Sequence, residues 1–301
     1  MEETQINGRR SAKPVIMLII GILGISMSAI FVRLSDAPSI VTAAYRLLWT
    51  VILMSPSMLL KKERRRELLG IKPKTLLLSA LSGVLLAVHF ATWFESLRRT
   101  TVASSTIIVC TEVIWVALGY CIFLKGKLGF KAIAAIAVTL LGSVLIAWTD
   151  SLGGTISGDM LALAAAVAVG AYTLLGRVVR CDTSTAVYTY IVYLSASAAL
   201  VISVFAGGYR LFGYGYRGIL SGLLLAVFST ILGHSIFSWC LKYFSPAFVS
   251  ASKLCEPVIS SAVAAALFGE IPTFLQILGS VIVLAGVVFY TVTEVKKPQE
   301  N

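Results

Sequence analysis

Charged residues are scarce in this sequence, and acidic residues are scarcer than basic ones. Charged residues make up 13% of the 301 residues, with 14 Asp and Glu against 25 Lys and Arg, while hydrophobic residues reach 58%. The mean hydropathy is +0.91. Soluble domains carry about a quarter charged residues. A soluble globular fold is therefore excluded, and most of the outer surface must face lipid.

The sequence also lacks the patterns of metal sites, disulfide frameworks and common hydrolases. Its five cysteines lie mostly inside apolar runs without paired metal-type spacing, and only two histidines occur. Neither an HExxH nor a GxSxG motif is present. We therefore expect no metal, no cofactor and no catalytic residue. An intramembrane enzyme is the most remote alternative.

Long apolar runs separated by short polar turns dominate the chain. A membrane helix needs about 20 predominantly apolar residues. The sequence predicts an all-α membrane protein with ten transmembrane helices, at 14–32, 39–60, 75–97, 102–123, 129–148, 158–179, 186–206, 216–239, 247–268 and 273–293. We expect the first run to be retained as a span, because it is too long for a typical signal peptide.

The distribution of basic residues predicts the orientation. Most Lys and Arg fall into alternate connections, and the largest cluster lies at 61–66. Because cytoplasmic loops are enriched in Lys and Arg, this pattern places both termini in the cytoplasm. The net charge of +11 is thus a membrane-topology signal, and we expect no nucleic acid partner.

The two halves of the chain resemble each other at a shift of 144 residues, which places Glu112 over Glu256 and Gly142 over Gly286. Five spans per half is an odd number, so the second half should be inverted relative to the first, as in many transporters. The predicted domains are a tail at 1–13, repeats at 14–150 and 151–294, and a tail at 295–301.

Several motifs then resemble one family. Tyr45-Arg46 in the second span, Glu256-Pro257 in the ninth, and Phe268-Gly269-Glu270 before a glycine-spaced last span are similar to the EamA family of the drug/metabolite transporter superfamily. The resemblance covers nearly the whole chain. It implies metabolite transport through a central cavity lined mainly by spans 1, 3, 4, 6, 8 and 9. The first half departs from the pattern, since Val113 follows Glu112.

Three ionisable residues near mid-membrane are candidate substrate ligands. Glu112 and Glu256 lie near the middle of spans 4 and 9, and Lys253 lies one turn before Glu256. Such residues usually face a partner or a wet cavity. Lys253 either forms a structural salt bridge with Glu256 or binds a substrate anion, while a glutamate meets an amine or carries a proton. We favour Glu112 as the glutamate open to substrate, because Glu256 has Lys253 and Pro257 beside it.

Histidine and aromatic side chains complete the candidate site. His89 and His234 occupy nearly equivalent places in the repeats and serve either packing or proton and substrate contacts. Trp93, one turn from His89, and Tyr172 in span 6 are predicted to flank the cavity or fill the core. For Arg46 we expect a structural role, with the side chain extended to the outer interface or paired with Glu95.

These observations, together with the family resemblance, favour a secondary active transporter of the bacterial cytoplasmic membrane. We expect it to export amino acids or similar small metabolites by alternating access, with proton coupling through Glu112. A carrier of phosphorylated metabolites or nucleotide sugars is the main alternative, with Lys253 and Arg46 as anion ligands. A passive channel is a further alternative.

Overall fold

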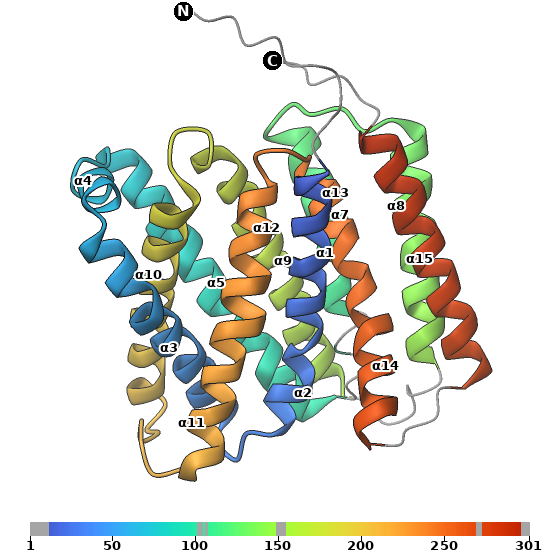
Figure 1. Cartoon of the computed structure of the whole chain (residues 1–301). Coiled ribbons are helices and arrows are strands. Elements are labelled where there is room, and N and C mark those ends of the chain that lie inside the picture. Colours follow the sequence, from blue (N-terminus) through green and yellow to red (C-terminus); the bar gives the residue numbers. More distant parts are fainter. Residues whose placement is uncertain (1–11, 101–104, 106–107, 149–154, 269–272, 296–301) are drawn as a thin grey trace, which may run out of the picture.

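The structure is a computed structural model that describes residues 12–100, 105, 108–148, 155–268 and 273–295. Every regular element in these ranges is a helix, and the long helices stand side by side in one bundle (Figure 1). The all-α fold predicted from the apolar runs is confirmed for these residues. Gly269-Glu270 and nearly all of the two predicted tails lie outside the described ranges.

Most helices coincide with the apolar runs of the sequence. The first half of the chain forms α1 (Lys13–Ser26), α2 (Ser28–Arg33), α3 (Ser39–Leu60), α4 (Lys62–Leu69), α5 (Pro73–Arg99), α7 (Glu112–Ile122) and α8 (Phe130–Trp148). The second half forms α9 (Ile156–Val179), α10 (Thr185–Ala206), α11 (Gly215–Leu224), η1 (Leu225–His234), α12 (Ser235–Cys240), α13 (Pro246–Ser252), η2 (Lys253–Cys255), α14 (Glu256–Phe268) and α15 (Phe274–Val295). The start of α1 and the end of α15 lie at the same end of the bundle (Figure 1).

Six helical segments of the described chain are long and apolar enough to cross a membrane. They are Lys13–Arg33, Ser39–Leu60, Pro73–Arg99, Ile156–Val179, Thr185–Ala206 and Gly215–Cys240. Three shorter apolar helices cover Ile108–Ile122, Phe130–Leu145 and Ile277–Thr293. The predicted span 247–268 corresponds to α13, η2 and α14, which follow one another without a loop.

The outer surface of the bundle is apolar. Leu77 of α5, Leu141 of α8 and Ile202 of α10 are each about two-thirds exposed. Soluble proteins rarely expose large contiguous apolar surface, whereas lipid contact favours it. The exposed leucines, isoleucines and valines therefore identify the surface that faces the hydrocarbon.

Helices from the two halves of the chain pack against each other in pairs. α5 packs on α9, α3 on α10, α8 on α15, α1 on η1 and α12, and α7 on α13. Each pair joins one helix of the first half to one of the second. The halves are thus interleaved in a single bundle and share one interior.

Glycines permit the closest of these helix contacts. A Cβ atom at Gly24 of α1 would lie 2.6 Å from the backbone oxygen of Phe228 in η1. A Cβ atom at Gly142 of α8 would lie 2.9 Å from the backbone oxygen of Gly279 in α15. Small residues at membrane-helix crossings allow backbones to approach in this way, so these two glycines set the distance between the helices.

Four helical segments depart from regular α-helical geometry. A turn at Met27 separates α1 from α2, a turn at Thr111 precedes α7, and η1 is π-helical over its 10 residues. η2 is a 3₁₀ turn just before Pro257. A proline lacks the N–H and clashes with the carbonyl four residues earlier, here that of Lys253, so the helix tightens at η2. Such irregular turns often mark functional sites.

Candidate functional site

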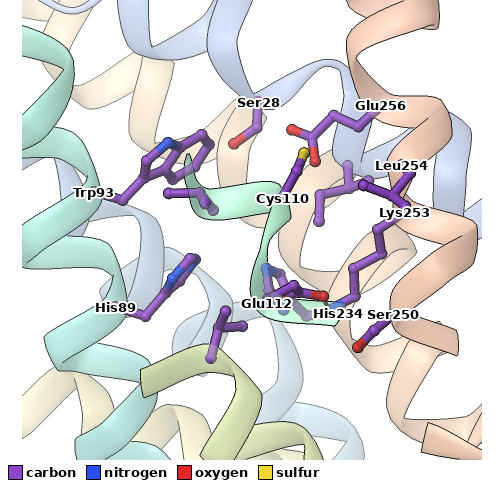
Figure 2. A pocket seen from close by; sticks show the side chains of 13 residues that line it. Ser28, His89, Trp93, Cys110, Glu112, His234, Ser250, Lys253, Leu254 and Glu256 are labelled. Carbon is purple, nitrogen blue, oxygen red and sulfur yellow. Dashed lines mark ion pairs between the residues drawn. The ribbon is translucent and has the colours of Figure 1, made fainter. Parts of the chain in front are cut away.

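A cavity lies among the four interrupted segments (Figure 2). Its volume is about 40 Å³, enough for about three water molecules. Both halves of the chain contribute to its wall, which consists of Ile25, Ser28, His89, Trp93, Val109, Cys110, Glu112, Val169, His234, Ser250, Lys253, Leu254 and Glu256. Six of the seven predicted ligands, all except Tyr172, therefore meet at one place.

An ion pair crosses this cavity from one half of the chain to the other. Lys253 Nζ lies 2.9 Å from Glu112 Oε1, and the two side chains are 9% and 7% exposed. The sequence suggested Glu256, one turn away, as the alternative partner of Lys253. The structure shows Glu112 instead, because the packing of α7 on α13 brings the carboxylate within reach of the ammonium group.

Glu256 is the carboxylate that stays open to the cavity. It is half-buried, and no hydrogen bond or ion pair to its side chain is found within the described ranges. It extends toward Cys110 and Ser28, whereas Lys253 extends the other way (Figure 2). The preference for Glu112 as the open carboxylate was therefore wrong, because it assumed that proximity along one helix decides the partner of Lys253.

The two histidines lie together in an aromatic cluster. The His89 ring stacks on Trp93 with centroids 5.8 Å apart, and it meets the His234 ring at 6.4 Å. His89 Nδ1 lies 3.0 Å from the backbone oxygen of Ala165. Because a carbonyl oxygen only accepts, Nδ1 carries the proton and donates it. This hydrogen bond holds the His89 ring in one orientation at the cavity wall.

Tyr172 supports the cluster from behind. Its ring packs edge-on against His234 at 6.1 Å, and its hydroxyl lies 3.0 Å from Ser238 Oγ. Tyr172 does not line the cavity, so the structure places it one layer behind the predicted position. His234 Nδ1 is buried and makes no hydrogen bond within the described part of the chain.

Arg46 is fully buried and faces the interior of the bundle. Its Nε donates to Thr230 Oγ1 at 2.7 Å, and Phe90 covers the guanidinium face at 4.0 Å. Both expectations for Arg46 were wrong. The side chain does not reach the outer interface, and Glu95 pairs at 2.8 Å with Arg99, one turn further along α5.

Sequence reasoning missed two hydroxyl groups of the cavity wall. Ser28 follows the turn at Met27 that separates α1 from α2. Ser250 precedes Lys253 by three residues and shares its helix face. That spacing was a usable signal for Ser250. Among the described residues no three His, Cys, Asp or Glu side chains gather as metal ligands.

Comparison with known proteins gives a family. The model of the EamA-like transporter family matches residues 12–148 and again residues 156–292. The chain belongs to the EamA-like transporter family. It is therefore an integral, multi-pass membrane protein of a transporter family.

One named relative and one solved structure are similar to this chain. A protein of Salmonella typhimurium (strain LT2) named "Probable amino-acid metabolite efflux pump" is 32% identical over 182 residues, which cover 56% of this chain and 60% of that protein. The matched segment thus spans about three-fifths of that relative. A solved crystal structure superimposes on 95% of this chain and 99% of its own with a TM-score of 0.76. With 14% identity, that likeness shows the fold alone.

Proposed function

We propose that this EamA-family protein is a secondary active transporter that exports amino acids or similar small metabolites across the bacterial cytoplasmic membrane. The observation that carries the proposal is the charged cavity inside an otherwise apolar bundle. One ammonium and two carboxylate groups from both halves of the chain surround it. Ionisable groups at such depth are costly and mark substrate or ion pathways.

We propose ten spans arranged as two inverted repeats, at 14–150 and 151–294, with cytoplasmic tails at 1–13 and 295–301. The helix pairs support this arrangement. A twofold axis in the membrane plane would exchange α1 with α9 and α5 with η1. The packing of α1 on η1 would then be the counterpart of the packing of α9 on α5, and both contacts are present. The glycines support it too. Gly142 of α8 faces the backbone of α15, while its counterpart Gly286 of α15 faces Thr139 of α8.

We propose alternating access because the cavity is too small for its substrate in the described state. About 40 Å³ admits a few waters, so a metabolite can enter only if the surrounding helices move. A larger hollow of about 530 Å³ lies where α2, α3, α5 and α11 end or begin, opposite the start of α1. Trp93 lines the cavity and Phe94 lines the hollow. This arrangement favours a pathway toward the non-cytoplasmic side.

Proton coupling is part of the proposal, with a revised carrier. The sequence argument assigned the proton to Glu112. Since Glu112 is already neutralised by Lys253 at 2.9 Å, Glu256 is the better candidate, because no ion pair neutralises it among the described residues. Phosphorylated substrates are disfavoured, since Lys253 is already paired with Glu112 and the Glu256 carboxylate in the same cavity would repel a phosphate.

Counterflow in proteoliposomes with a panel of labelled amino acids tests the proposal. We expect saturable exchange, loss of exchange in Glu112→Gln and Lys253→Gln, and loss of pH-gradient dependence in Glu256→Gln. Glu95→Gln, outside the cavity, is the matched control and should transport normally. Exchange of phosphate esters with no amino acid exchange, in folded protein, would reject amino acids as the substrate class.

A further inference from the structure

Arg46 has more hydrogen-bond donors than the surrounding protein accepts. A guanidinium has five N–H donors in a rigid fork. Nε donates to Thr230, Nη1 lies 3.4 Å from Ser28 Oγ, and Nη2 is buried without a partner in the described ranges. No carboxylate of these ranges forms an ion pair with Arg46. A fully buried cation in this state is costly, so its unused donors are suited to an anionic ligand.

The charges around the cavity show where that partner would sit. Two cations and two carboxylates surround this part of the bundle, and Lys253 and Glu112 neutralise each other. Arg46 and Glu256 remain: they attract each other electrostatically, but no ion pair joins them among the described residues. Ser28 connects them, because it contacts Arg46 and lines the cavity with Glu256. Figure 2 shows Ser28 and Glu256 at the same end of the cavity.

We propose that Arg46 and Glu256 together bind the two charged ends of a zwitterionic substrate, the carboxylate and the ammonium group of an amino acid. The Nη1–Nη2 edge of Arg46, with Ser28, receives the carboxylate, and Glu256 receives the ammonium group. This assignment rests on the proposed transport function and deepens it. Arg46 suits the carboxylate because its planar fork forms two parallel hydrogen bonds to one carboxylate.

The surroundings of Arg46 hold the guanidinium ready for this task. Phe90 covers one face of the group and Thr230 fixes Nε, so rotation about the last bonds of the side chain is restricted. A pre-oriented group loses less entropy when it binds a ligand. Lys253 cannot replace it while it is paired with Glu112, and its ammonium lacks the fork geometry.

Ligand pairs that differ by one charge test this assignment. The full-length protein is purified in detergent, and affinity is measured from ligand-induced thermal stabilisation with L-phenylalanine, phenethylamine (which lacks the carboxylate) and 3-phenylpropionate (which lacks the ammonium group). The same three compounds compete in counterflow. The variants are Arg46→Gln, Arg46→Lys and Glu256→Gln, with Arg99→Gln as an exposed arginine control.

We expect Arg46→Gln to weaken L-phenylalanine binding by about 10- to 100-fold, the range for a hydrogen-bonded charge pair, and to leave phenethylamine within about twofold. Glu256→Gln should weaken phenylalanine and phenethylamine but spare 3-phenylpropionate. Arg46→Lys keeps the charge without the fork and should show an intermediate loss. It also keeps the test valid should Arg46→Gln fail to fold.

Two results separate failure of this inference from failure of the proposed function. Equal weakening of phenylalanine and phenethylamine by Arg46→Gln or Arg46→Lys would make Arg46 a structural residue and overturn the assignment, although transport would stand. If no amino acid stabilises or exchanges in the wild-type protein, the proposed function itself fails. Other amino acids with their matching amines extend the panel.

Discussion

Removing Lys253 from the Lys253–Glu112 pair should destabilise the protein strongly. Both side chains are at least nine-tenths buried, and their charged atoms are 2.9 Å apart. Removing one member of a buried ion pair typically costs about 3–5 kcal/mol, because the other charge stays buried without compensation. For Lys253→Met we expect a loss of that size in the free energy of unfolding.

Glu112→Gln should cost less, about 1–3 kcal/mol. The flexible Lys253 side chain has a second carboxylate, Glu256, in the same cavity, and it can turn toward that group once Glu112 is neutral. The double variant Lys253→Met/Glu112→Gln should recover most of the lost stability, because replacing both members of a buried pair is often neutral. It should still fail to transport.

The assay is reversible unfolding in mixed micelles, followed by a spectroscopic measure of helix content. The Glu95–Arg99 pair is the matched control, with a similar distance of 2.8 Å but side chains 36% and 51% exposed. Exposed pairs contribute about 0–1 kcal/mol, so Glu95→Gln should change stability little. The reasoning is refuted if Lys253→Met costs no more than Glu95→Gln, or if the double variant is as unstable as the sum of the singles.

Two further predictions concern the backbone. Gly24→Ala should lower thermal stability and expression, because the added Cβ would lie 2.6 Å from a backbone oxygen of η1. Gly129→Ala is the control and should be neutral, because a Cβ there has nothing within 4 Å. Equal melting temperatures for the two variants would contradict the close contact between α1 and η1. Pro257→Ala restores an N–H and allows a continuous helix through η2. We therefore expect unchanged or higher thermal stability and slower counterflow. An unchanged transport rate would show that the interruption at η2 is dispensable.

The fold could be predicted from the sequence because its main signal is local. Each apolar run of about 20 residues encodes a membrane helix without reference to its neighbours. The predicted spans 39–60 and 186–206 match α3 (Ser39–Leu60) and α10 (Thr185–Ala206) to within one residue at each end. Hydropathy could not reveal the π-helical η1 or the turn at Met27, because these depend on packing between helices.

The sequence predicted which residues belong to the candidate site better than it predicted which of them form pairs. Rarity of charge inside the membrane identified Glu112, Lys253 and Glu256 from residue type and depth alone. Their partners depend on how helices distant in sequence rotate against each other, which no single-chain pattern encodes. That is why Lys253 was matched with Glu256 along its own helix, and why Arg46 was matched with Glu95.

The four interrupted helices and the small cavity have one common explanation. A regular α-helix bends only at a cost in hydrogen bonds, and identifiable causes such as proline or a π-turn lower that cost. Here the interruptions fall beside the residues that line the cavity: Met27 beside Ser28, Thr111 beside Glu112, and η2 at Lys253 itself. In the alternating access that we propose, a cavity of about 40 Å³ would widen to admit a metabolite by movement at turns that are already irregular. Ser28 adjoins the turn at Met27 and Glu256 adjoins η2, so in the proposed binding mode the substrate contacts two of the helices at the points where they are interrupted.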